Sequence, residues 1–260
     1  MKFGRSILVS LAMAAHMACA GLATAAEKVP QSLLWVGNSF FYYNNSMHNY
    51  VLNFARADKN TEARGVSLTI SGSGIDWHDV SAYLKPGLIG SYTFVGDNEL
   101  QFNKPGRQFD GVVLMDCSQC PVHPQLGAIF HRFAKKHAQT IRKAGAQPIF
   151  FMSWAYKDKP EMTEGLATAY DKAGRDNKAL VIPAGLAFAN AVKARPDLEL
   201  YQRDKRHPTL AGTYLAAATT YATVYGKSPV GSSFTSGLDA PTAQFLQQIA
   251  WDTVQARQKK

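Results

Sequence analysis

The sequence predicts an α/β fold in which helices cover both faces of a parallel sheet. Short apolar runs, typical of buried strands, alternate along the chain with longer segments whose apolar residues recur at helical spacing. Continuous apolar strands separated by helices indicate a parallel sheet that is buried on both sides. The 260 residues, 46% hydrophobic and 18% charged, suit one globular domain with a large core.

Five short runs are the candidate strands. In chain order they cover residues 33–36, 67–70, 111–116, 148–154 and 179–183. Most of these runs are apolar at consecutive positions, as expected for the inner strands of a covered sheet. Polar or small residues follow each run, so the loops after the strands are the candidate binding region.

The segments between and after these runs carry a helical pattern. Met47, Tyr50, Val51 and Phe54 stand at i, i+3, i+4 and i+7 and form one apolar stripe. Similar patterns predict helices over 126–141, 161–175, 209–225 and 239–258. By contrast, residues 86–107 show no period, and we expect a long insertion there that shapes the pocket.

The first residues have the pattern of a secretory signal peptide. Lys2 and Arg5 precede a mostly apolar stretch over 7–20, and Ala23-Thr24-Ala25 is a typical cleavage site. We expect residues 1–26 to be removed and residues 27–260 to form one domain in the periplasm or outside the cell. Lipidation at Cys19 is a weaker alternative, because His16 stands where a lipoprotein signal normally has leucine.

Charge narrows the choice of partners. Cleavage removes two cations and no acids, so the net charge falls from +9 to +7. Such an excess could attract an anionic polysaccharide, or only keep the protein soluble. The cations are scattered and not interleaved with aromatics, which disfavours nucleic acid. No later stretch is apolar enough for stable membrane insertion.

Residues with catalytic chemistry follow the predicted strands, where doubly wound sheets bind ligands. Ser39 ends Gly37-Asn38-Ser39, and Asp204 and His207 stand three residues apart before a helix. A serine hydrolase needs a nucleophile, a base and an acceptor that orients the base, and these residues supply all three. Gly74 can bring a backbone N–H to the oxyanion. Taken singly, each also fits an ordinary cap or turn.

Two blocks resemble the SGNH/GDSL hydrolase superfamily: the GNSF at 37–40, and the D-K-R-H-P at 204–208. This resemblance implies a three-layer α/β/α, flavodoxin-like fold with a central, mostly parallel five-stranded sheet. It implies a serine esterase with Ser39 as nucleophile, His207 as base and Asp204 as its partner, and with no cofactor or metal. The N–H groups of Ser39 and Gly74 would hold the oxyanion. Exported members of this kind are thought to deacylate saccharides.

The third block of the family departs from this pattern. Its usual oxyanion-hole asparagine is missing from residues 115–121, where Gln119 or Ser118 could donate instead, and Gly72 competes with Gly74 for the second-block role. The loss of such a donor typically costs about 10²–10³ in rate. A glycan-binding protein without catalysis on the same fold therefore stays open as an alternative.

Cys117 and Cys120 are the only cysteines left after cleavage, in the motif C-S-Q-C. In an oxidising compartment we expect a local disulfide. A less favoured alternative is a thiol or metal protein centred on these two residues, with His123 nearby. One C-x-x-C and one histidine fall short of a structural zinc set.

Four further residues are candidates for substrate binding. Asn38 and Tyr42 flank the proposed nucleophile, His78 follows Gly74, and Trp154 ends the fourth run and could stack on a sugar ring. Each has an ordinary alternative: His78 on a helix face and Trp154 in the core.

Overall fold

The structure is a computed structural model, and it describes residue 1, residues 29–104 and residues 106–258. Apart from residue 1, the signal peptide expected over 1–26 lies outside the described residues, as does Cys19. Cleavage, export and the lipidation alternative therefore stay predictions.

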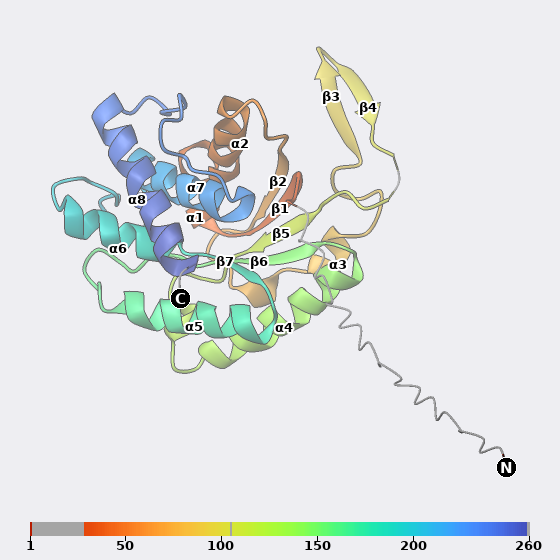
Figure 1. The fold of residues 1–260 in the computed structure, drawn as a ribbon, viewed down its shortest axis with the longest axis horizontal. Coiled ribbons are helices and arrows are strands. Elements are labelled where there is room, and N and C mark those ends of the chain that lie inside the picture. Colours follow the sequence, from red (N-terminus) through yellow and green to blue (C-terminus); the bar gives the residue numbers. More distant parts are fainter. Residues whose placement is uncertain (2–28, 105, 259–260) are drawn as a thin grey trace.

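A five-stranded parallel sheet forms the centre of the molecule (Figure 1), in the order β2-β1-β5-β6-β7. All of its strand pairs are parallel, as predicted. Compared with the prediction, the second strand begins earlier and the third ends earlier. The strands are β1 (Ser32–Gly37), β2 (Arg64–Thr69), β5 (Gly111–Leu114), β6 (Gln147–Phe151) and β7 (Leu180–Ile182).

Helices form a layer on each side of this sheet, which confirms the three-layer α/β/α prediction (Figure 1). Alternate residues of β1 serve the two layers: Leu33 and Trp35 belong to one apolar cluster, and Leu34 and Val36 to the other. Both sets are buried, which explains the continuous apolar run. The first layer has α2 (Met47–Ala57), α6 (Ala184–Ala194), α7 (Leu210–Tyr225) and α8 (Ala240–Gln258), and the second has α3 (Val80–Tyr83), α4 (Gly127–Lys143) and α5 (Met162–Asp176).

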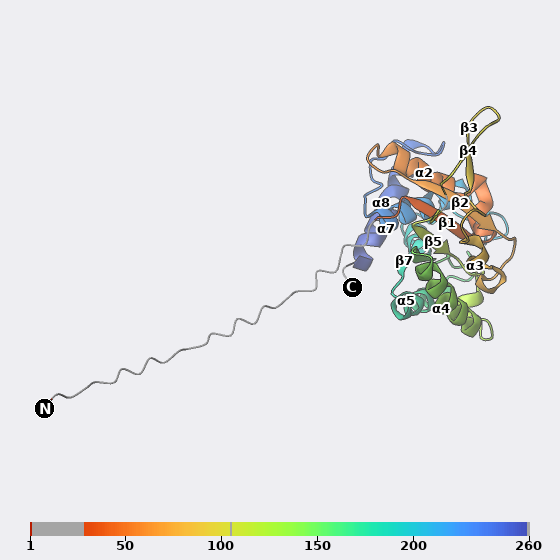
Figure 2. The ribbon, with the colours of Figure 1, turned by 90° about the vertical axis from the view of Figure 1, so that its right-hand side faces the viewer.

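The segment 86–107 differs from its prediction. It contains an antiparallel hairpin, β3 (Tyr92–Gly96) and β4 (Glu99–Phe102), that projects from the body (Figures 1 and 2). Its base packs near Phe109, and the next residue, Asp110, accepts the N–H of Ser32 at the start of β1. The hairpin therefore rises from the amino ends of the strands, so the expectation that it shapes a pocket at their carboxyl ends is wrong.

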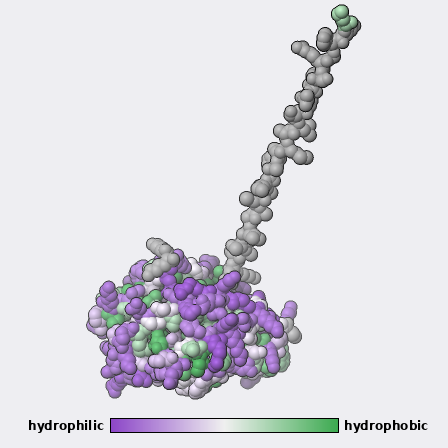
Figure 3. Space-filling model, turned by 90° about the horizontal axis from the view of Figure 1, so that it is seen from below, coloured by the Kyte–Doolittle hydropathy of each residue, from purple (hydrophilic) through white to green (hydrophobic). Residues whose placement is uncertain are grey.

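The side of the molecule on which α4 and α5 lie is mostly hydrophilic, with only small apolar patches (Figure 3). Among the described residues, no helix has the length and apolarity needed to span a bilayer. The large apolar side chains that are exposed are instead concentrated on the hairpin and on loops.

Candidate active site

The turn that presents Ser39 is as short as the sequence suggests. β1 ends at Gly37 and α1 (Ser39–Tyr42) begins at Ser39, so that Asn38 alone connects them. A Cβ atom on Gly37 would lie 2.8 Å from the ring of Phe41, so glycine is required where the chain turns. Ser39 is half-buried at the start of α1, and its hydroxyl faces the loop before α7.

The structure brings Ser39, His207 and Asp204 together in one line. The Oγ of Ser39 lies 2.8 Å from Nε2 of His207, and Nδ1 of His207 bonds Oδ2 of Asp204. A carboxylate accepts the proton of Nδ1, which leaves Nε2 as the acceptor for the serine hydroxyl. This geometry can transfer the Ser39 proton to His207.

Asp204 is fixed as an anion by its own loop. Its second oxygen accepts the backbone N–H of Arg206 at 2.9 Å and that of His207 at 3.0 Å. Partial burial raises the pKa of the Asp204 carboxyl, but the hydrogen bonds from the His207 ring and from these two N–H groups outweigh it and lower the pKa to about 2. Asp204 is therefore ionised throughout the range in which a histidine can act as a base.

Aromatic rings hold the imidazole in place. Tyr43 stacks on His207 with centroids 4.2 Å apart and planes 9° apart, and Phe40 meets it edge-on at 5.4 Å. Phe40 in turn stacks on Trp154 at 4.8 Å. Sequence reasoning did not assign Tyr43 or Phe40 to this task, although their place beside Ser39 was a usable signal.

Trp154 lies in the core and not in the cleft. It is fully buried between Phe40 and Phe188, and its indole N–H donates to the carbonyl of Arg206 at 2.9 Å. The suggested stacking on a sugar ring therefore has no place in this structure. Trp154 instead fixes the backbone next to His207, and so helps to position the imidazole.

A second contact fixes the same loop from the other side. Asn44 donates from its amide to the carbonyl of Pro208 at 3.0 Å and to the hydroxyl of Thr213 at 2.7 Å. Its φ of 53° lies in the left-handed region, which asparagine tolerates better than most residues. The residues after the nucleophile and the loop before α7 are thereby connected directly.

Asn38 also supports the site, in place of the substrate-binding role expected for it. Only 4% exposed, it donates to the carbonyls of Ser73 at 3.0 Å and Asp116 at 3.1 Å. Its carbonyl oxygen accepts the N–H of Phe40 and caps α1. One amide thus joins the three loops that follow β1, β2 and β5.

The other two substrate-binding candidates lie differently from each other. His78 is 4% exposed and bonds the hydroxyl of Ser73 at 2.9 Å, while burial lowers the pKa of its ring. A buried and hydrogen-bonded histidine of this kind does not reach a ligand. Tyr42 is 39% exposed, and its hydroxyl shares a 3.0 Å hydrogen bond with that of Ser71. Of the four substrate-binding candidates, Tyr42 alone is accessible.

Two backbone N–H groups are free to act as oxyanion donors. Neither the N–H of Ser39 nor that of Gly74 makes a hydrogen bond within the described part of the chain. A Cβ atom on Gly74 would lie 2.6 Å from Oδ1 of Asp76, so this position also favours glycine. Gly72, the rival candidate, is exposed with a φ of 71° and serves a turn.

The side chains proposed to replace the missing asparagine do not form a clear donor. Gln119 is exposed and precedes a short 3₁₀ turn (Cys120–Val122). The hydroxyl of Ser118 shares a 2.7 Å hydrogen bond with that of Tyr156. Backbone groups are therefore the better supported donors.

Asp116, which the sequence did not single out, lies beside Gly74. Its Oδ1 accepts the N–H groups of Ile75 at 2.7 Å and Cys117 at 2.8 Å, and the residue is 2% exposed. Burial raises the pKa of this carboxyl to about 6, against the opposing effect of the two N–H groups. A carboxyl of this kind titrates close to neutral pH.

The predicted disulfide between Cys117 and Cys120 is present, directly after Asp116. The ligand atoms of these three residues lie within 4.8 Å of one another. With both sulfurs in the disulfide, neither is a thiolate, which is the form that binds metals and reacts as a nucleophile. The structure therefore gives no support to a thiol or metal centre here.

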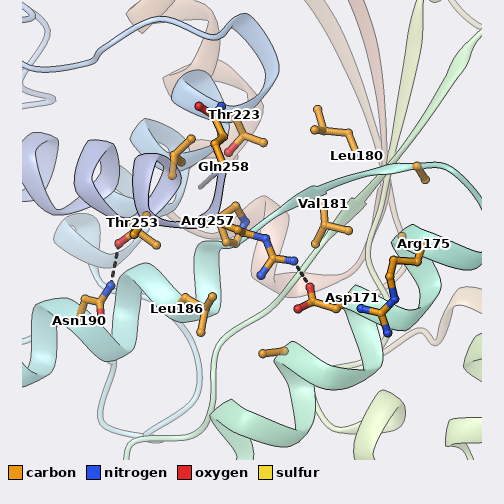
Figure 4. A pocket seen from close by; sticks show the side chains of 16 residues that line it. Asp171, Arg175, Leu180, Val181, Leu186, Asn190, Thr223, Thr253, Arg257 and Gln258 are labelled. Carbon is orange, nitrogen blue, oxygen red and sulfur yellow. Dashed lines mark hydrogen bonds and ion pairs between the residues drawn. The ribbon is translucent and has the colours of Figure 1, made fainter. Parts of the chain in front are cut away.

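A hollow of about 720 Å³ lies away from these residues, between α5, β7, α6 and the end of α8 (Figure 4). Leu180, Val181 and Leu186 supply apolar surface, and an ion pair between Asp171 and Arg257 crosses it. None of Ser39, His207 and Asp204 lines this hollow. The candidate catalytic residues lie instead at the carboxyl ends of the strands.

No protein-family model and no curated protein matches this sequence. Solved structures do match the fold. A DUF4886 family protein from Bacteroides uniformis has a TM-score of 0.63 at 16% identity, covering 87% of this chain and 95% of that one. A putative SGNH hydrolase from Slackia heliotrinireducens has a TM-score of 0.58 at 21% identity, covering 74% of this chain and 98% of that one. An acetylxylan esterase from Geobacillus stearothermophilus has a TM-score of 0.54 at 15% identity, covering 78% of this chain and 97% of that one. The chain therefore has the fold of the SGNH/GDSL hydrolases.

Proposed function

We propose that this protein is an exported serine esterase. The observation that carries the proposal is the continuous hydrogen-bonded line from Ser39 through His207 to Asp204, built at the turn after β1. The same three functional groups in this relative arrangement recur on unrelated folds as the machinery of acyl transfer. The fold shared with known hydrolases and esterases adds to this argument.

The reaction follows from the atoms that meet. The Oγ of Ser39 attacks the acyl carbonyl while Nε2 of His207 takes its proton. The C–O bond to the alcohol then breaks, and His207 returns the proton to that oxygen. Water, deprotonated by His207, attacks the acyl–Ser39 ester and releases the acid. Throughout, Asp204 stabilises the imidazolium.

Negative charge develops on the carbonyl oxygen during both steps. The unused N–H groups of Ser39 and Gly74 are the donors proposed for it, aided by the field at the start of α1. Backbone donors need no reorganisation during the reaction. They can compensate in part for the missing asparagine of the third block.

For the substrate we propose an ester, such as an O-acetyl group, on a saccharide. Tyr42 and Trp77 are 39% and 61% exposed; Tyr42 ends α1, which begins at Ser39, and Trp77 ends the 3₁₀ turn that follows Gly74. Exposed aromatic rings of this kind can pack on the apolar faces of sugars. The exposure of Trp77 was not anticipated from the sequence. An acetylxylan esterase is among the proteins of similar fold.

Export is proposed from the sequence pattern at the start of the chain. The disulfide between Cys117 and Cys120 supports it, because disulfides persist in oxidising compartments. The expected attraction of the basic mature chain to anionic polysaccharide is part of the same proposal.

The decisive experiment compares p-nitrophenyl acetate hydrolysis by the mature protein and by Ser39→Ala at equal concentration. The matched control is Ser233→Ala, because Ser233 is exposed and lies far along the chain from Ser39, Asp204 and His207. We expect the control to keep full activity and Ser39→Ala to lose about 10⁴-fold or more, since the members of such a triad act as a unit.

Acetate release from acetylated xylan and from acetylated monosaccharides then tests the substrate class. A higher kcat/KM for these acetylated saccharides than for p-nitrophenyl butyrate supports a saccharide esterase. Equal hydrolysis by wild type and Ser39→Ala would contradict the serine mechanism, and retained glycan binding by both would favour the non-catalytic alternative.

A further inference from the structure

The β3–β4 hairpin has one apolar face. Tyr92 pairs with Phe102, and Phe94 pairs with Leu100. Since paired residues and residues two apart along a strand share a face, these four side chains lie together. Thr93 and its partner Gln101 occupy the opposite face. The hairpin is therefore amphipathic, although no such period stands out in the sequence.

No element among residues 29–104 and 106–258 covers this apolar face. Tyr92, Phe94, Leu100 and Phe102 are 51%, 66%, 49% and 74% exposed. Within the described residues, the ring contacts of these side chains are to one another. An isolated two-stranded hairpin is at best marginally stable in water and needs packing on its apolar face. Such a surface indicates a partner.

The geometry of the rings disfavours a glycan as this partner. Tyr92 meets Phe94 at 89° and Phe102 at 70°, so the rings form no flat platform for a sugar. A bilayer is disfavoured for two reasons. Asp97 and Glu99 lie at the tip, where they would meet headgroups, and the free strand edges would lack hydrogen bonds in lipid. A protein surface avoids both problems.

The charges of the hairpin are segregated along its length. The turn carries Asp97 and Glu99, whereas Lys104 follows β4 at the base and Lys85 precedes the hairpin. Neither lysine forms an ion pair within the described part of the chain. A five-residue strand spans about 17 Å, more than the screening length of about 8 Å at physiological salt. Tip and base therefore present separate charges.

A second copy of the same hairpin, lying antiparallel to the first, can both cover the apolar face and pair with the charges of the tip and the base. Its apolar face covers the first, and each acidic tip lies beside the other copy's basic base. The three rings, exposed by 51–74%, leave about 400 Å² on each copy. Two copies with the leucines added approach about 1,000 Å², the lower limit for a specific interface. The association would thus be modest in strength.

We propose that two copies of this chain associate through their β3–β4 hairpins, packed face to face around a two-fold axis. Tyr92, Phe94, Leu100 and Phe102 form the centre of this interface, and the tip and base charges set its direction. In each copy the hairpin rises from the amino ends of the strands, and the candidate active site lies at their carboxyl ends. The two candidate active sites therefore lie at the far ends of the pair.

Sedimentation velocity of the mature protein over a wide concentration range tests this interface. We expect a reversible monomer–dimer equilibrium that Phe94→Ser/Phe102→Ser weakens at least tenfold. The control, Thr93→Ala/Gln101→Ala, changes the opposite face of the same hairpin and should associate like wild type. Circular dichroism and thermal unfolding show whether each variant is folded. A wild type that stays monomeric at every concentration overturns the proposal.

Charge variants test the antiparallel direction independently of the apolar face. In Asp97→Lys/Glu99→Lys both ends are basic, and in Lys85→Glu/Lys104→Glu both are acidic. We expect each variant alone to associate more weakly than wild type, and an equimolar mixture to recover association as a heterodimer. If the mixture associates no better than the separate variants, the antiparallel pairing is wrong.

Discussion

At the carboxyl end of the sheet, Asn38 and Trp154 are buried, and each bonds the backbone of a neighbouring loop. At the amino end, the β3–β4 hairpin leaves Phe94 and Phe102 exposed, and in the described part of the chain their ring contacts are to Tyr92 of the same hairpin. The first region is organised within the single chain, whereas the second leaves an apolar face that, in our proposal, a second copy covers. Substitutions should therefore lower stability and activity at the carboxyl end of the sheet and be tolerated on the hairpin at its amino end.

The largest effect is expected for Asn38→Ala. The change removes the donor to the carbonyls of Ser73 and Asp116 and the cap of Phe40 N–H, all in buried surroundings. Such losses add to about 4 kcal/mol of unfolding free energy, with at least a 100-fold loss in kcat as the loops separate. Urea unfolding and ester hydrolysis measure the two. Gln101→Ala on the hairpin is the control, and equal stability of both variants would break the comparison.

Asp116→Asn should raise stability, and only at higher pH. Burial raises the pKa of this carboxyl to about 6 from 3.8, so the folded state binds the proton more tightly than the unfolded state. Its stabilising contribution is complete below about pH 3.8 and is lost as the pH rises through about 6. The variant should gain up to about 3 kcal/mol at about pH 8 relative to about pH 4. A gain independent of pH would contradict a buried charge.

Trp154→Phe keeps the stack between Phe40 and Phe188 but removes the hydrogen bond to the carbonyl of Arg206. We expect a loss of about 1–2 kcal/mol in stability and a fall of about tenfold in kcat with KM unchanged, because the His207 loop loses its anchor. Steady-state kinetics separates these parameters. A change confined to KM would show that Trp154 contacts substrate after all.

The smallest effect is expected for Phe94→Ser. The side chain is 66% exposed in the single chain, so its removal should change unfolding free energy by less than about 0.5 kcal/mol, measured where the protein is monomeric. Hydrolysis should also stay unchanged, since the hairpin lies at the other end of the sheet. A large loss of stability would mean that this face is buried against the body.

The sequence was most informative where local chemistry and local structure coincide. The apolar run before Gly37, the turn at Ser39 and the three-residue spacing of Asp204 and His207 depend on few residues, and these pointed to one site. The geometry of that site is consistent with the roles proposed. Trp154 and His78 were placed poorly, because burial depends on distant segments such as α6, which was not anticipated.

The hairpin could not be foreseen for a related reason. Its strands have few residues, a bulge near Val95 interrupts their register, and they bury nothing in the single chain. The alternation of apolar and polar residues covers only Tyr92 to Phe94 and Leu100 to Phe102, which is too short to stand out as a period. Tyr43 and Asn44 stand close to Ser39 in the sequence, but their contacts with His207 and Pro208 cross more than 160 residues of chain.

The ion pair between Asp171 and Arg257 has a consequence for handling the protein. β7 is an outermost strand of the sheet, and this pair connects α5 with the end of α8 across the hollow beside it. An uncovered edge strand is a template for strand addition by other molecules. A protein truncated before Arg257 would keep Ser39, His207 and Asp204 in place, but we expect it to aggregate slowly in storage. Affinity tags and truncations are therefore best kept away from the last turn of α8.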